Sequence, residues 1–107
     1  MKLLLDENLP VRLKADILVG EVFTMDELGW KGKQNGELLA LLVANRFDFL
    51  LTMDKSLRYQ QAIEHYNVRM IVLRAVHNKR SELLPLLPSL AEYLREGPYE
   101  KVRVIAV

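Results

Sequence analysis

The 107-residue chain contains no cysteine and no long hydrophobic run. The missing cysteine excludes disulfides, thiolate zinc sites and a cysteine nucleophile. The longest apolar run, residues 38–44, is far shorter than the roughly 20 residues that span a bilayer. Asp6 and Glu7 interrupt the first apolar segment too early for a signal peptide. We therefore expect a cytoplasmic protein with no membrane partner.

The chain also lacks an excess of charge of either sign. Fifteen Lys and Arg residues face 14 Asp and Glu residues, which leaves a formal net charge of +1. Any contact with nucleic acid must therefore come from a local basic patch rather than from bulk charge. There is no phosphate-binding glycine loop, no Ser-His-Asp arrangement and no internal repeat. Half of the residues are hydrophobic, enough for one domain, residues 1–107, with one core.

The first ten residues carry the clearest pattern. Lys2 to Leu5 is a short apolar run that stops at Asp6 and Glu7, and Pro10 follows. A continuous apolar run is typical of a buried parallel strand, and proline is at home in the first turn of a helix. The segment therefore predicts a strand, an acidic pair and a helix, with carboxylates at the strand end where α/β sheets bind ligands.

A second segment repeats this arrangement. Phe47 to Leu51 is another apolar run, and Asp54 follows it. If the two strands are parallel neighbours, Asp6 and Asp54 meet at one edge of the sheet. Two like charges about 4 Å apart repel by roughly 4 kcal/mol at an effective dielectric near 20. A proton, a Lys or Arg side chain, or a metal ion must relieve that repulsion.

The remaining segments alternate between helical and extended patterns. We expect an α/β protein with a mainly parallel sheet of four to five strands, covered on both faces. The predicted strand order is 2-1-3-4, with the last strand at an edge. Helices are predicted at 9–19, at 35–45 with Asn35 as the cap, and at 57–66 with Ser56 as the cap; a last helical region at 81–96 should break or start late at Pro88. The further strands are predicted at 21–24, 68–73 and 101–107. Loops are predicted at 25–34 and 74–80.

Four carboxylates form the candidate site: Asp6, Glu7, Glu37 and Asp54. Carboxylate oxygens suit hard cations such as Mg²⁺ or Mn²⁺, which can position and polarise a phosphodiester. Each carboxylate also has an ordinary structural interpretation. Asp6 can cap the following helix, Glu37 can interact with a helix dipole, and Asp54 can pair with Lys55 or with an arginine of the next helix. The joint position of Asp6 and Asp54, each after an apolar run, favours the site.

Several segments resemble one family in order and spacing. Leu-Leu-Asp-Glu-Asn-Leu-Pro at 4–10, Gly-Trp-Lys-Gly-Lys-Gln-Asn-Gly-Glu-Leu-Leu at 29–39, Leu-Leu-Thr-Met-Asp-Lys at 50–55 and Ile-Val-Leu-Arg-Ala at 71–75 are similar to the compact PIN-like proteins. These are related to the PIN-domain ribonuclease toxins of bacterial toxin–antitoxin modules. The resemblance covers nearly the whole chain. It implies a three-layer α/β/α sandwich and a Mg²⁺- or Mn²⁺-dependent nuclease.

The resemblance also assigns roles by position. Asp6, Glu37 and Asp54 match the catalytic, metal-binding acids, Glu7 is a further candidate metal ligand, and Thr52 matches a supporting hydroxyl residue. Many relatives carry an Asp where Asn35 stands and a further Asp near Ser56, so this pocket has fewer anionic ligands. RNA, a small antitoxin-like protein and a second copy of the chain in a homodimer are the partners that the resemblance implies.

Five cations lie in segments predicted near the same edge of the sheet and could guide a phosphate backbone: Lys31, Lys33, Lys55, Arg58 and Arg74. They are equally well explained as solvated loop charges. Trp30 could stack a base, although packing of its loop is the simpler role. His77 has no second histidine nearby and receives no catalytic role.

Three functions follow. The first is a metal-dependent ribonuclease, with Asp6, Asp54 and Glu37 holding the ion. The second is a catalytically inactive PIN-like module that binds RNA or a partner protein, which the neutral Asn35 and Ser56 favour. The third is a response-regulator receiver with Asp54 as phosphoacceptor, which the absence of a hydroxyl residue directly after Leu73 disfavours.

Overall fold

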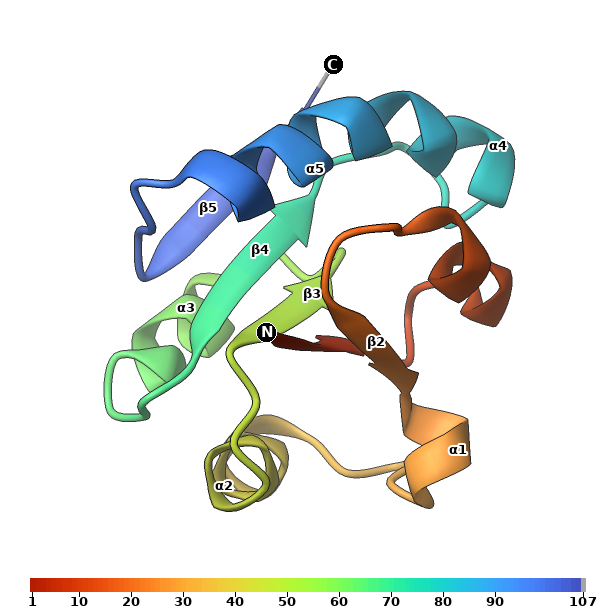
Figure 1. Cartoon of the computed structure of the whole chain (residues 1–107). Coiled ribbons are helices and arrows are strands. Elements are labelled where there is room, and N and C mark those ends of the chain that lie inside the picture. The colour runs from red at the N-terminus through yellow and green to blue at the C-terminus, as the bar shows by residue number, and fades with distance from the viewer. Residues whose placement is uncertain (107) are drawn as a thin grey trace.

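Five short strands form one sheet in the computed structural model, which describes residues 1–106. They are β1 (Lys2–Leu5), β2 (Glu21–Thr24), β3 (Phe49–Thr52), β4 (Arg69–Leu73) and β5 (Val102–Ile105). Each strand pairs in parallel with its neighbours in the order β2-β1-β3-β4-β5 (Figure 1). The predicted order, with the last strand at an edge, is confirmed. Val107, the end of the predicted final strand, lies outside the described residues.

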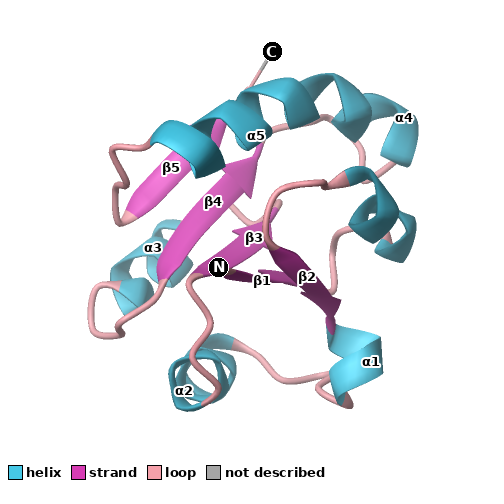
Figure 2. Ribbon diagram, viewed as in Figure 1, coloured by secondary structure: helices cyan, strands magenta, loops and turns pink. Residues whose placement is uncertain are grey.

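Helices cover both faces of this sheet (Figure 2). On one face lie α1 (Met25–Leu28), α2 (Asn35–Ala44) and α3 (Leu57–Ile63). The other face carries the 3₁₀-helices η1 (Val11–Asp16) and η2 (Leu84–Leu86), with α4 (Arg80–Leu83) and α5 (Leu87–Glu96). This α/β arrangement is compatible with the expected three-layer sandwich. No helix within residues 1–106 is long and apolar enough to cross a membrane.

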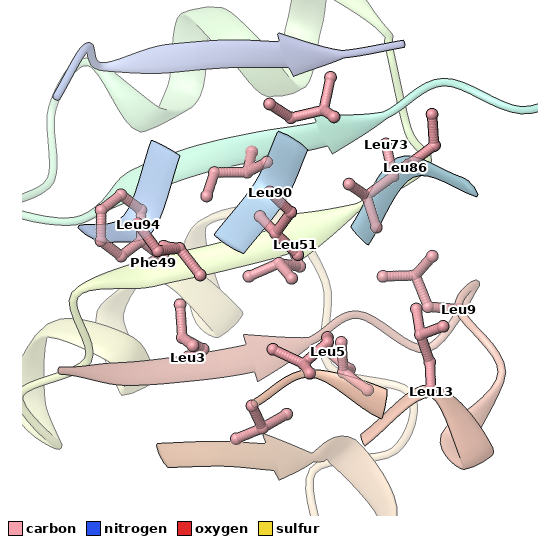
Figure 3. Packing of buried hydrophobic residues seen from close by; sticks show 14 of the residues in the cluster. Leu3, Leu5, Leu9, Leu13, Phe49, Leu51, Leu73, Leu86, Leu90 and Leu94 are labelled. Atoms are coloured by element: carbon pink, nitrogen blue, oxygen red, sulfur yellow. The ribbon is translucent and has the colours of Figure 1, made fainter. Parts of the chain in front are cut away.

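Two hydrophobic clusters, one on each face, explain the continuous apolar runs. Side chains alternate between faces along a strand, so a strand covered on both sides is apolar at every position. Leu3 and Leu5 of β1 pack in the cluster under α5, together with Leu90 and Leu94 (Figure 3). Leu4 points to the opposite face and packs in the cluster under α2 and α3. All three β1 leucines are at most 1% exposed.

Two predicted segments differ from the structure. The helix expected over residues 9–19 is the shorter 3₁₀-helix η1, because Ile17 is already extended (φ −92°, ψ 108°) and the chain turns at Gly20 to enter β2. The loop expected over 25–34 begins with α1. Thr24 and Glu27 form a reciprocal capping box: the Thr24 hydroxyl accepts from the Glu27 N–H and the Glu27 carboxylate accepts from the Thr24 N–H. That Thr-x-x-Glu signal is present in the sequence.

The predicted helix caps have different outcomes. Asn35 is not the cap of α2: the extended Gln34 holds that position, and Asn35 is the first helical residue with φ 47°. The Ser56 cap is confirmed, since its hydroxyl accepts from the Tyr59 N–H at 3.3 Å. The late start at Pro88 is also confirmed, because α5 begins at Leu87 and Pro88 lies in its first turn. Helix α3 ends at Ile63, three residues earlier than predicted.

Candidate functional site

The two central strands bring Asp6 and Asp54 to one edge of the sheet. β1 and β3 are hydrogen-bonded neighbours, with Leu5 opposite Leu51. The Asp6 N–H continues this ladder and donates to the Leu51 carbonyl at 2.8 Å. The chain crosses to one side of β1 to form β2 and to the other side to form β3 (Figure 1). The carboxyl ends of β1 and β3 therefore lie at the topological switch point, where open α/β sheets bind ligands.

The Thr52 hydroxyl is the centre of the local hydrogen-bond network. It donates to Asp6 Oδ2 at 2.8 Å and accepts from Asn8 Nδ2 at 3.1 Å and from the Asp54 N–H at 2.9 Å. The Asn8 NH₂ group and the Asp54 N–H can only donate, so they use the two lone pairs of the hydroxyl oxygen. The hydroxyl proton must then point at Asp6. Thr52 is fully buried, which fixes this direction.

Asn8 completes the link between the two strand ends, a role that the sequence-based prediction missed. Its Oδ1 accepts from the Met53 N–H at 3.2 Å, while its Nδ2 donates to Thr52. A backbone N–H cannot accept, so this contact sets the orientation of the amide. Asn8 therefore fixes the loop after β1 to the loop after β3. The Asn two residues after Asp6 is visible in the sequence, but its partners become visible only when the strands pair.

Burial raises the pKa of the Asp6 carboxyl above its ordinary value of 3.8. Hydrogen bonds from Thr52 and from the Glu7 N–H lower this pKa, and the negative charges of Asp54 and Glu7 raise it; the net direction is upward. No Lys or Arg within residues 1–106 forms an ion pair with Asp6 or Asp54. The charge of Asp6 is thus disfavoured and has no cationic protein partner among the described residues.

Asp54 turns the chain into α3. Its Oδ1 accepts from the Ser56 N–H at 2.8 Å, and Ser56 in turn caps the helix. The predicted alternative, an ion pair with Lys55 or Arg58, does not form within the described residues. Nor does any side chain of residues 1–106 cap η1, so Asp6 does not have the capping role considered for it.

A cavity of about 290 Å³ opens beside the two carboxylates. Burial raises the pKa of the Tyr59 phenol above its usual range, and the charges of Asp6 and Asp54 raise it further, so the phenol stays protonated at neutral pH. Lys33 is a cation at the rim. The cavity is lined by Asp6, Glu7, Asn8, Lys33, Gln34, Asn35, Leu38, Asp54 and Tyr59.

The other two predicted acids are engaged elsewhere. Glu37 does not line this cavity; its side chain is 63% exposed and pairs with Lys33 at 3.3 Å. Glu7 lines the cavity, but its Oε1 accepts from the Gly32 N–H at 2.6 Å and so holds the loop before α2. Within residues 1–106, no three His, Cys, Asp or Glu side chains are grouped closely enough to hold a metal ion.

The predicted cations differ in their distance from the site. Lys33 lines the cavity. Lys31 lines an adjoining cavity of about 260 Å³, whose lining also includes Asp6 and Glu7. The Lys31 ammonium lies 3.6 Å from an Asp26 carboxylate oxygen. The other three are exposed on segments that follow the carboxyl ends of β3 and β4: Lys55, Arg58 and Arg74.

The polar lining of the cavity consists of three carboxylates, three side-chain amides, a lysine and a phenol, and Glu7 is the carboxylate already engaged by the Gly32 N–H. Mg²⁺ keeps several of its waters in proteins and is commonly bound through only one or two carboxylates. Asp6 and Asp54 are therefore sufficient in kind for such an ion, although the four-acid set is not assembled. Comparison of the chain with protein-family models, with curated proteins and with solved structures gave no match.

Proposed function

We propose that this chain is a PIN-like ribonuclease that depends on Mg²⁺ or Mn²⁺ and holds the ion through Asp6 and Asp54. One observation carries the proposal. Two carboxylates from adjacent central strands share a cavity at the switch point of the sheet, and no cation of residues 1–106 pairs with either. A hard divalent cation would remove the repulsion between them and would favour the ionised form of Asp6.

The residues around the cavity support a role in phosphodiester hydrolysis. A bound divalent ion would supply Lewis-acid polarisation of a phosphoryl oxygen and a more acidic water. Thr52 and Asn8 orient the two acids through the contacts described above. Lys33, although it pairs with Glu37, places a positive charge at the rim, where it would attract a phosphate. The neutral phenol of Tyr59 can donate a hydrogen bond into the cavity.

Mn²⁺ binding measured by calorimetry tests this proposal. We expect saturable binding by the native chain and none by an Asp6→Asn/Asp54→Asn double variant that circular dichroism shows to be folded. Glu21→Gln is the matched control, because it removes one exposed carboxylate at the first residue of β2, at the other end of the sheet. Absence of binding to the native chain at millimolar Mn²⁺ would contradict the proposal.

Cleavage of RNA is the second measurement. The native chain should hydrolyse single-stranded or structured RNA only when Mn²⁺ or Mg²⁺ is added, and the Glu21→Gln protein should match it. An activity that persists unchanged in Asp6→Ala protein would be a contaminant and would count against a nuclease.

A second candidate function is an RNA- or protein-binding module without catalysis. The exposed position of Glu37 favours this binding module. It leaves Asp6, Asp54 and Glu7 as the acids that line the cavity, and Glu7 is already engaged by the Gly32 N–H. This module would bind RNA with the same affinity in Mn²⁺ and in chelator, and Asp6→Asn would not change that affinity. A metal-dependent affinity would instead support the nuclease.

The receiver function has less support. Arg74 and Ala75 follow β4, and Ala106 follows β5, so within residues 1–106 neither strand end carries the hydroxyl or lysine that such a phosphoacceptor site would use. Stable phosphorylation of Asp54 by a small-molecule phosphodonor would be needed to revive it.

A further inference from the structure

A second cavity lies at the opposite edge of the sheet. Its volume is about 420 Å³, and its lining includes Asp48 just before β3, Arg69 at the start of β4 and Lys101 just before β5. Because the strands are parallel, these amino ends lie at the edge away from Asp6 and Asp54. This cavity is therefore separate from the proposed nuclease site.

Three cations from three distant segments line this cavity: Arg46, Arg69 and Lys101. None of them forms an ion pair with another side chain within residues 1–106. Lys101 donates to the Tyr66 carbonyl, which leaves its positive charge without a counter-ion. The convergence of three like charges on one hollow raises the electrostatic free energy of the free protein unless an anion offsets it.

The single carboxylate in the lining offsets only part of that charge. Asp48 Oδ2 accepts from the backbone N–H of Lys2 at 2.7 Å, so the carboxylate is committed to holding the start of β1. Tyr99 adds an aromatic ring, with the Arg69 guanidinium 5.7 Å from its centroid. The cavity thus combines excess positive charge with a partly exposed ring.

Arg46 occupies a backbone position where an arginine is unfavourable. Helix α2 ends in a Schellman motif: the Phe47 N–H donates to the Leu42 carbonyl at 2.9 Å and the Arg46 N–H to the Val43 carbonyl at 3.1 Å. This motif places Arg46 in the left-handed region, with φ 61°, where glycine is the usual residue. A glycine would serve the helix end better, so the side chain, rather than the turn, is the feature that needs an explanation.

We propose that this cavity binds a phosphate group, with Arg46, Arg69 and Lys101 as its cationic ligands. Arginine presents a planar fork of donors that matches phosphate oxygens, and lysine adds a point charge. Free phosphate and the phosphate of a mononucleotide share this chemistry. A mononucleotide would in addition place its base against Tyr99.

Calorimetric titration of the full chain with inorganic phosphate and with adenosine 5′-monophosphate tests the proposal. The titrations are done at low ionic strength and with a chelator, so that no ligand is held through a metal at Asp6 and Asp54. The native chain should bind at least one of the two probes saturably. Equal affinities for the two would identify the phosphate alone as the ligand, and tighter binding of the mononucleotide would show that the base is bound too.

Two variants place the ligand in this cavity. Arg46→Gly removes the guanidinium while the backbone keeps a favourable conformation, and Arg69→Gln removes a charge with little change in size. Each should weaken binding at least about tenfold, because each removes a charge-assisted hydrogen bond. Arg12→Gln is the matched control on the exposed face of η1 and should change the affinity by less than about twofold, since a distant surface charge is screened.

The Asp6→Asn/Asp54→Asn double variant should bind both probes as the native chain does, whatever the outcome of the nuclease experiments. The proposal is overturned if neither probe binds the native chain, if Arg46→Gly and Arg69→Gln bind unchanged, or if Arg12→Gln weakens binding as much as they do.

Discussion

The Thr52 hydroxyl donates a hydrogen bond of 2.8 Å to Asp6 Oδ2, which joins the carboxyl ends of β3 and β1. The same oxygen accepts from the side chain of Asn8 and from the backbone of Asp54. One buried hydroxyl therefore satisfies three polar groups and sets the relative positions of both acids. A change at Thr52 should affect stability and the acidity of Asp6 together.

Replacing Thr52 by Val keeps the shape of the side chain and removes all three hydrogen bonds. We expect the free energy of unfolding to fall by about 1–3 kcal/mol, because partly buried donors lose their acceptor. The pKa of Asp6 should rise further, since the hydrogen bond from Thr52 lowers it in the native chain. Urea unfolding and carbon-13 NMR of the carboxyl group measure these effects. Thr52→Ser keeps the hydroxyl and is the control. If the Thr52→Val protein is as stable as the Thr52→Ser protein, the hydrogen bonds of this hydroxyl contribute nothing measurable to stability.

Asp6 should make the folded chain less stable as the pH rises. Its pKa is higher in the folded chain than the ordinary value of 3.8, so the folded state holds the proton more tightly than the unfolded state. The free energy of unfolding then decreases with pH above about 3.8 until Asp6 has ionised in the folded state. Without divalent metal, Asp6→Asn should therefore gain stability relative to the native chain as the pH rises above about 3.8.

Asp16 supplies the matched control with the opposite sign. Its hydrogen bonds with Arg80, at 2.6 and 2.7 Å, lower its pKa, so its contribution to stability is present above about 3.8 and is lost as the pH falls through its folded pKa. Asp16→Asn should therefore converge with the native chain at low pH. Parallel pH profiles for Asp6→Asn and the native chain would contradict the raised pKa of Asp6.

The parallel sheet and the meeting of Asp6 with Asp54 at one edge could be predicted because both follow from simple rules. Runs without alternation, such as Leu3 to Leu5, indicate strands buried on both faces, and these are parallel in α/β proteins. The ends of such strands lie at a common edge. The capping box at Thr24 was also readable, but the glycines and the charges of residues 25–34 favoured a loop.

The position of Glu37 could not be predicted in the same way. Helix α2 is apolar at every position from Leu38 to Ala44, so its sequence does not define one buried face. The packing of Leu38, Leu39 and Leu42 under the sheet sets the rotation of the helix and leaves Glu37 exposed. The contacts of Asn8 were hidden for a related reason, since they join residues 44 and 45 positions apart in the chain.

Gly20 should not tolerate a side chain. Its φ of 86° lies in the left-handed region, and a Cβ there would stand 2.7 Å from Leu3 Cδ1, whose side chain is fully buried. Gly20→Ala should lower the free energy of unfolding by about 1–3 kcal/mol, through backbone strain and displacement of Leu3. Thermal or urea unfolding measures the loss. Gly29→Ala is the control: its φ is 72° but a Cβ meets nothing within 4 Å, so it should cost less than Gly20→Ala.

Arg46 gives a prediction about stability that is independent of any ligand. Both Arg46→Gly and Arg46→Ala remove the guanidinium. In the left-handed backbone conformation of residue 46 a Cβ crowds the carbonyl oxygen, and only glycine, which has no Cβ, avoids this clash. The glycine variant should therefore be more stable than the alanine variant by about 1 kcal/mol, and at least as stable as the native chain. Urea unfolding without phosphate compares the three proteins.

If the Arg46→Ala and Arg46→Gly proteins are equally stable, the backbone at Arg46 is not strained, and the Schellman motif no longer argues that the arginine side chain is kept for binding. If glycine stabilises the chain and phosphate no longer binds, the native arginine is maintained at the expense of stability.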